Sequence, residues 1–198
     1  MRILVVGATG TIGRAVVSAL ERDHEIVAAT RNSTPVSVDI ADPDSIEAMY
    51  RKVGQIDAVI SVAGAAKFAP LAQLTDADFF FSLQNKLMGQ VNLTRFGLGF
   101  VRDRGSITLT SGVLARAPMA GSAAISLVNA GIEGFARAAA LEAPRGIRVN
   151  VVSPPWVTET LQGLGMDPSP GLTADTVARA YVESVTGTRS GAVTEPSA

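Results

Sequence analysis

Three glycines lie three residues apart, at Gly7, Gly10 and Gly13, directly after an apolar run at the start of the chain. A glycine at the first position allows a tight turn, one at the second lets the backbone approach a pyrophosphate, and one at the third lets the following helix pack close to the strand. The amides and dipole of that helix would attract the same anion. The pattern predicts a dinucleotide-binding turn, with an ordinary turn between strand and helix as the alternative. The residues expected to contact the cofactor here are Gly7, Thr9, Gly10, Thr11, Ile12 and Gly13.

The end of the second predicted strand indicates which dinucleotide would bind. A site for NAD usually places an acidic residue there, about 20 residues past the glycines, to accept a hydrogen bond from the ribose 2′-hydroxyl. This chain has Arg31, Asn32 and Ser33 instead. The Arg31 guanidinium suits a 2′-phosphate and the other two side chains would add donors, so the sequence favours NADP(H) over NAD(H). A solvated arginine in a polar loop is the alternative.

Two residues at the end of the third predicted strand are candidates for the adenine end of the cofactor. Asp39 can accept a hydrogen bond from the adenine amino group, and Ile40 can pack on the ring. A helix-capping or turn role beside Asp42 is the alternative for Asp39.

Strands and helices alternate along the chain in the manner of a parallel sheet. Apolar, β-branched runs predict strands, and apolar residues at helical spacing predict the helices between them. Strands buried on both faces and joined by right-handed crossovers give an α/β fold of three layers around a doubly wound parallel sheet, whose ligands lie at the carboxyl ends of the strands. The expected strands are 3–6, 25–30, 37–40, 57–62, 106–110, 148–152 and 192–195, and the expected helices are 14–22, 43–53, 76–99, 121–141 and 174–185, with an irregular loop over 153–171.

Composition narrows the class of protein further. The chain has 198 residues (20.5 kDa), enough for one domain over 1–198, with 47% hydrophobic and 18% charged residues and a mean hydropathy of +0.29. Its net charge of −1 provides no basic field for nucleic acid or anionic lipid. The lack of cysteine and the single His24 exclude thiolate and zinc chemistry. The most apolar later window, 120–141, carries an asparagine, a glutamate and an arginine, so a cytoplasmic protein without metal, nucleic-acid or membrane partners is expected.

Several longer motifs run through the chain beyond the glycine turn. They are Val38-Asp39-Ile40, Val62-Ala63-Gly64, Gly105-Ser106-Ile107 and, most specifically, Glu133 to Arg137 together with Pro144 to Pro154. With the glycine turn, these motifs resemble the short-chain dehydrogenase/reductase (SDR) family over nearly the whole length. The resemblance implies a Rossmann-type fold, a nicotinamide cofactor, a small-molecule substrate and a homodimer or homotetramer built on the long fifth and sixth helices. It also implies cofactor contacts from Ala63, Gly64, Pro154 and Val157.

The resemblance ends at the positions that carry the family's chemistry. In the family a tyrosine donates the proton and a lysine four residues later holds the nicotinamide ribose, but an ungapped register puts Ile125 and Asn129 at these positions. The family's serine falls on Gly112, next to Ser111, and the asparagine of its fifth helix falls on Lys86. The sequence is therefore that of an atypical member, without the Tyr-x-x-x-Lys pair.

Two explanations account for these changes. In the first, the site is rebuilt: Lys86 acts as a ribose anchor, an electrostatic stabiliser or the proton donor, and Ser111 hydrogen-bonds a substrate oxygen. A solvated lysine and a serine satisfied by the backbone are the alternatives. This explanation gives an NADP(H)-dependent oxidoreductase acting on a small carbonyl or alcohol. In the second, the chain binds NADP(H) without redox turnover, as a sensor or structural protein, or catalyses a non-redox reaction.

Overall fold

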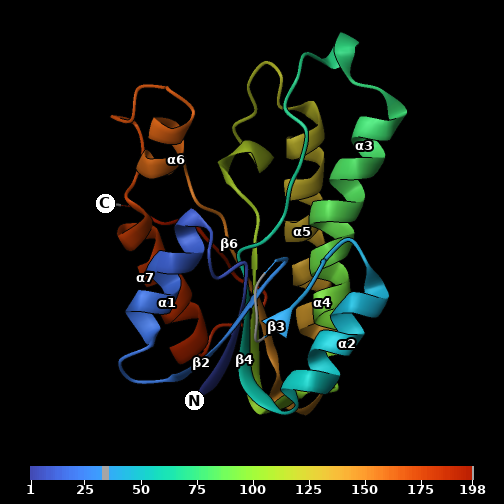
Figure 1. Cartoon of the computed structure of the whole chain (residues 1–198), viewed down its shortest axis with the longest axis vertical. Helices are drawn as coiled ribbons and strands as arrows, with labels where there is room; N and C mark the ends of the chain where they lie inside the picture. Colours follow the sequence, from blue (N-terminus) through green and yellow to red (C-terminus); the bar gives the residue numbers. More distant parts are fainter. Residues whose placement is uncertain (33–35, 198) are drawn as a thin grey trace.

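Parallel strands organise the chain, as the alternating pattern predicts. The computed structural model describes residues 1–32 and 36–197, and these residues form a seven-stranded sheet in the order β3-β2-β1-β4-β5-β6-β7, with every neighbouring pair parallel (Figure 1). The direction of strand addition reverses between β1 and β4, which is where α/β sheets of this kind bind ligands. The strands are β1 (Arg2–Val6), β2 (Glu25–Thr30), β3 (Val36–Ser37), β4 (Ile56–Ser61), β5 (Val101–Thr110), β6 (Arg148–Val152) and β7 (Val193–Thr194).

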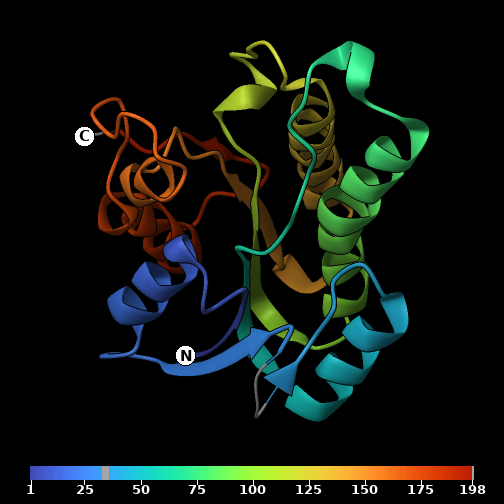
Figure 2. The same cartoon turned by 45° about the horizontal axis from the view of Figure 1, so that its top comes forward.

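Helices cover both faces of the sheet. Helices α1 (Thr11–Leu20) and α7 (Ala174–Thr186) lie on one face, and α2 (Pro43–Val53), α4 (Gly89–Gly97) and α5 (Ala123–Glu142) lie on the other (Figures 1 and 2). Because successive strand residues point to opposite faces, β1 supplies both cores. Ile3 and Val5 pack with α1 and α7, whereas Leu4 and Val6 pack with the opposite helices. The predicted three-layer fold is confirmed.

Local signals fix the ends of several elements. Asp42 caps α2 by accepting a hydrogen bond from the Asp44 amide, Pro43 occupies the first turn, and Gly54 ends the helix with φ 73°. The predicted bounds of β2, α2 and β6 agree with the structure, and α7 and β7 agree within two residues. None of the described helices is long and apolar enough to span a membrane.

The third strand is shorter than predicted. It covers only Val36–Ser37 instead of reaching residue 40. The Asp39 carboxylate accepts from the Ala41 amide at 3.0 Å, and the Asp39 amide donates to Ser45 Oγ at 3.0 Å. These local hydrogen bonds turn the backbone away from the sheet, because side chains of this type compete with strand pairing.

The helix predicted over residues 76–99 is helical from Asp76 to Gly97 but contains a π-helical segment that the sequence did not predict. The structure has α3 (Asp76–Ser82), a π-helical segment η2 (Leu83–Met88) and then α4. At the start of α4, a Cβ on Gly89 would lie 2.9 Å from the main-chain oxygen of Ile40, so this glycine allows a close contact that holds α4 in place. π-helical turns interrupt α-helices most often at functional sites. This one carries Lys86.

The irregular loop predicted after residue 152 contains a helix. Helix α6 (Thr158–Gly163) follows Val157, which forms a parallel bridge with Leu172. The Glu159 carboxylate accepts from the Ala174 amide at 3.0 Å, and Leu161 is buried. We call residues 157–172 the flap; the bridge joins its two ends, and Glu159 fastens it to the start of α7.

Candidate functional site: two adjoining pockets at the carboxyl edge of the sheet

The glycine turn has the tight geometry that its spacing predicts. Gly7 adopts φ +90°, and its carbonyl oxygen accepts from the Gly10 amide at 3.0 Å. A Cβ on Gly13 would lie 2.1 Å from that same oxygen, so α1 could not approach β1 with any other residue there. A Cβ on Gly10 would meet nothing in the protein nearer than 3.4 Å. Gly13 therefore serves packing within the protein, whereas Gly10 leaves space outside it.

A first pocket of about 310 Å³ lies beside this turn, at the carboxyl ends of β1, β2 and β4. The bare backbone at Gly10 borders it, and apolar Val38 and Ile40 form another wall. This arrangement fits a dinucleotide, because the turn offers amides to a pyrophosphate and the apolar wall offers a surface to a purine. The pocket is lined by Val6, Gly7, Thr9, Gly10, Thr30, Arg31, Val38, Ile40, Val62, Ala63, Gly64, Ala65 and Asn85.

Arg31 enters this pocket already paired. Its Nη2 donates to Asp39 Oδ1 at 3.1 Å and to Asn85 Oδ1 at 3.4 Å. Both side chains of the ion pair are more than 40% exposed, and exposed pairs of this kind contribute little to stability, so an incoming phosphate can compete for the guanidinium. Asn32 is exposed and does not line the pocket. Ser33 lies outside the described residues.

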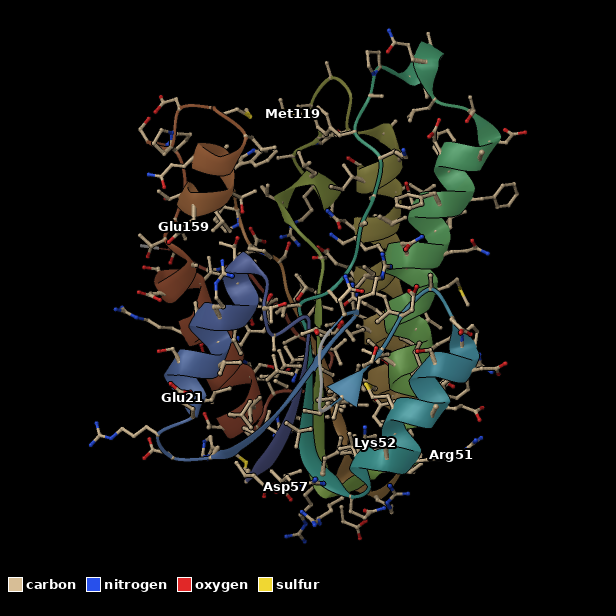
Figure 3. All side chains as sticks on the ribbon, viewed as in Figure 1. Glu21, Arg51, Lys52, Asp57, Met119 and Glu159 are labelled. Carbon is tan, nitrogen blue, oxygen red and sulfur yellow. The ribbon has the colours of Figure 1, made fainter. Side chains whose placement is uncertain are left out.

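A second pocket, also of about 310 Å³, adjoins the first and shares Val62 and Gly64 with it. Its walls come from β5, α5, the flap and η2. Figure 3 labels Met119, in the segment before α5, and Glu159, in α6, in the upper half of the molecule. Asp57 and Lys52 mark the opposite end of the molecule. The lining residues are Ile12, Val62, Gly64, Lys86, Thr110, Ser111, Gly112, Val113, Leu114, Ile125, Asn129, Pro154, Pro155, Trp156, Val157 and Thr160.

Most of the predicted cofactor and catalytic residues line these two pockets. Ile12, Pro154 and Val157 lie in the second pocket together with both catalytic candidates, Lys86 and Ser111. Thr11 borders a separate groove between α1 and the start of α7. Gly13 lines neither pocket, since its space is taken up by the turn itself.

Lys86 reaches the second pocket from η2. Its stem passes across Gly64, where a Cβ would lie only 2.9 Å from Lys86 Cγ, so the glycine makes room for the lysine. The Nζ atom donates to the main-chain oxygen of Ser111 at 3.3 Å. Burial lowers the pKa of Lys86 from 10.5 to about 8, because desolvation disfavours the charged form. An amine with this pKa exchanges a proton readily near neutral pH.

Ser111 is fixed by main-chain and side-chain contacts. Its amide donates to Val152 at 3.0 Å, and the preceding Thr110 is held by Gln90, whose side chain both donates to and accepts from the Thr110 backbone. Ser111 Oγ donates to Glu133 Oε1 at 2.9 Å. The buried Glu133 in turn pairs with Arg116 at 3.0 Å. The serine therefore has a defined position and a defined hydrogen-bond partner.

Asn129 faces the same pocket from α5. It is 2% exposed, and its Oδ1 has no hydrogen-bond partner among residues 1–32 and 36–197. Its Nδ2 has a long contact, 3.5 Å, to the Gly112 carbonyl oxygen. A buried acceptor without a partner is unfavourable, so this atom is poised to receive a donor from a ligand.

Sequence reasoning missed two residues that hold Ser111 in the second pocket. Glu133 and Arg116 are joined to Ser111 only through contacts between distant segments. One signal was available for Glu133: a glutamate amid apolar residues of an alanine-rich helix requires a partner when it is buried. No comparable signal marks Arg116.

The parallel sheet, its reversal between β1 and β4 and the glycine turn define a dinucleotide-binding α/β protein of the Rossmann type. A family model described as "Enoyl-(Acyl carrier protein) reductase" matches residues 9–192. The chain belongs to the short-chain dehydrogenase/reductase family of oxidoreductases.

Several known proteins are similar to the chain in sequence, in structure or in both. The solved structure of lin1944 from Listeria innocua is 40% identical, with a TM-score of 0.94 over 98% of both chains. A small-chain dehydrogenase solved in complex with NADPH is 25% identical, with a TM-score of 0.87 over 98% of this chain and 95% of its own. Hydroxynaphthalene reductase arp2 of Aspergillus fumigatus is 29% identical over 150 residues, and the match covers 73% of this chain and 55% of the fungal protein.

Proposed function

We propose that the protein is an NADP(H)-dependent oxidoreductase that interconverts a small carbonyl compound and its alcohol through a rebuilt site. The observation that carries this proposal is the position of Lys86, whose amino group reaches the second pocket beside Ser111. Ile125 and Asn129, at the positions where the resemblance implies tyrosine and lysine, line the same pocket. Lys86 is thus the one titratable side chain among the described residues that line this pocket.

The first pocket binds the phosphate end of the cofactor, and the second pocket holds the group that transfers the proton. A bound nicotinamide cofactor supplies or accepts the hydride. The Lys86 ammonium donates a proton to the oxygen of the carbonyl substrate during reduction, and the neutral amine takes it back from the alcohol during oxidation. Ile125 and Trp156 contribute apolar surface that limits water in this pocket. The glycine turn and Arg31 hold the phosphates at the other end of the cofactor.

The proposed preference for NADP(H) rests on Arg31 and is tested by calorimetric titration with NADPH, NADP⁺, NADH and NAD⁺. We expect Arg31→Ala to weaken NADPH binding about 10- to 100-fold and NADH binding less than about twofold, because only NADPH carries the 2′-phosphate that accepts charged hydrogen bonds. Arg22→Ala, at an exposed position in the turn before β2, is the control. Equal weakening of both cofactors would contradict the assignment.

The rate should depend on the protonation of Lys86. Its pKa of about 8 means that the ammonium is present below that pH. Carbonyl reduction should therefore be fastest below about pH 8 and fall about tenfold per pH unit above it, whereas alcohol oxidation should rise through the same pH. Stopped-flow rates of the chemical step, measured in both directions, check this. A profile without a transition near pH 8 would remove Lys86 from the proton transfer.

A second candidate function is cofactor binding without redox turnover. The observation in its favour is that Ile125 cannot donate a proton and Asn129 carries no charge. Tight binding of NADPH, with no change in nicotinamide absorbance over a panel of carbonyl compounds, would favour this candidate. Absence of binding to all four cofactors would reject both candidates.

Self-association and a cytoplasmic location belong to the same proposal. Apolar side chains on the outer side of α3, η2 and α5 are exposed, among them Phe80, Met88 and Leu127. A homodimer or homotetramer would cover them.

A further inference from the structure

Ser111 already donates its hydroxyl hydrogen to Glu133. An ionised carboxylate only accepts hydrogen bonds, and Glu133 is held in an ion pair by Arg116, so Ser111 is the donor in the 2.9 Å contact. Ser111 is 3% exposed and Glu133 is 4% exposed, so water competes little for this bond. What Oγ can still offer to a ligand is its lone pairs. Ser111 therefore accepts hydrogen bonds and does not donate them to a substrate oxygen.

The second pocket thus combines buried acceptors with a single cation. Asn129 Oδ1 lacks a donor and Ser111 Oγ can still accept one, whereas a carbonyl oxygen has no hydrogen to give. Among the described lining residues, the charged donor is Lys86 Nζ, which lies 3.3 Å from the main-chain oxygen of Ser111, a residue that lines the same pocket. A substrate matched to this pocket presents a carbonyl oxygen to the cation and a hydroxyl beside it to the acceptors.

We propose that Glu133 is a specificity-determining positioning residue, which makes Ser111 an acceptor and so selects carbonyl compounds with a hydroxyl on the adjacent carbon. The substrate class is an α-hydroxy ketone or aldehyde. This inference rests on the proposed function, since it assigns the carbonyl oxygen to Lys86. Glu133 itself touches neither substrate nor cofactor in this scheme; it acts through Ser111.

The test uses esters that cannot be turned over, so that recognition is measured apart from chemistry. Methyl glycolate and methyl acetate share a carbonyl group and differ by one adjacent hydroxyl. Their dissociation constants are measured by NMR titration, in the presence and absence of NADP⁺. We expect the protein to bind methyl glycolate about 5- to 10-fold more tightly, the range expected for one added hydrogen bond.

Glu133→Gln tests the positioning role. The Arg116 guanidinium has only donors, so the amide oxygen will face Arg116 and the amide nitrogen will face Ser111. Ser111 then accepts from the amide and turns its hydrogen to the pocket, and the preference for methyl glycolate should fall within about twofold. Ser111→Ala should remove the preference while the Glu133–Arg116 pair stays intact, which provides a second variant if Glu133→Gln does not fold. Glu142→Gln, at an exposed position on the same helix, should change nothing.

The outcomes separate this inference from the proposed function. Weak or equal binding of the two esters, or an unchanged preference in both Glu133→Gln and Ser111→Ala, overturns the inference. The ketone pair 1-hydroxy-2-butanone and 2-butanone is then compared by kcat/KM with NADPH. Ester discrimination without reduction of either ketone means that the oxidoreductase proposal fails while hydroxyl recognition stands. Equal reduction of both ketones means that the oxidoreductase proposal stands while hydroxyl recognition fails.

Discussion

Replacing Lys86 by methionine is expected to lower turnover about 10²- to 10⁴-fold, the usual contribution of a general acid, while NADPH still binds within a few-fold of its original affinity. Methionine fills the space that the lysine stem occupies across Gly64, but it has no proton to give. Single-turnover rates and calorimetric titration measure the two quantities separately. Lys52→Met, at the opposite end of the molecule (Figure 3), is the matched control. Unchanged turnover in Lys86→Met would exclude Lys86 from the chemistry.

The same variant should be more stable than the original protein at neutral pH. Because the pKa of Lys86 is lowered to about 8 in the folded state, its ammonium is destabilising wherever both states are protonated, which is below about pH 8. This penalty decreases as the pH rises from about 8 towards the ordinary lysine value of 10.5. The difference in melting temperature between Lys86→Met and the original should therefore be largest at neutral pH and shrink above pH 8. A gain in stability with a loss of rate identifies a functional lysine and not a structural one.

Alanine substitutions at two glycines of the same turn are expected to have different effects, one on folding and the other on cofactor binding. Gly13→Ala places a Cβ 2.1 Å from the Gly7 carbonyl oxygen, which α1 cannot avoid without moving off the sheet, so we expect severe destabilisation. Gly10→Ala meets no protein atom nearer than 3.4 Å, so the protein should fold. Its methyl group would point into space that a pyrophosphate requires, and NADPH affinity should fall about 100-fold or more, since the backbone must approach the phosphates closely.

Circular dichroism and thermal melting report the fold of these variants, and calorimetry reports cofactor binding. Gly134→Ala in α5 is the control, because its Cβ would meet nothing within 4 Å and alanine favours helix by about 1 kcal/mol. It should fold, bind NADPH normally and melt slightly higher. Normal NADPH affinity in a folded Gly10→Ala protein would show that the turn is only a connection between β1 and α1.

Elements with strong local signals could be predicted from the sequence. The bounds of α2 follow from Asp42 and Pro43 at its start and Gly54 at its end. Strands β2 and β6 follow from their apolar runs. The π-helical segment could not be predicted, because the spacing of apolar residues over 76–99 does not distinguish it from the α-helices on either side. Helix α6 was missed because its anchor, the contact between Glu159 and the start of α7, joins separate parts of the chain.

The candidate site, too, could be predicted only where local signals were present. The glycine turn could be predicted from the spacing of its glycines. The ungapped register with the SDR family was sufficient to place Lys86 and Ser111 in one pocket. The sequence could not predict that Ser111 acts as a hydrogen-bond acceptor toward the pocket, because this depends on Glu133, which is 22 residues away. The pairing of Arg31 with Asp39 was also missed, since the sequence assigned each of them to a different part of the cofactor.

The flap is closed by the bridge between its two ends, Val157 and Leu172, and it is attached to the start of α7 through Glu159. Between these attachments, residues 162–170 are almost all exposed and belong to neither sheet nor core. Loops of this kind tolerate changes in length at little cost in free energy. Residues 162–170 can therefore be lengthened or shortened while the flap residues that line the second pocket, Val157 and Thr160, and the glycine turn keep their positions.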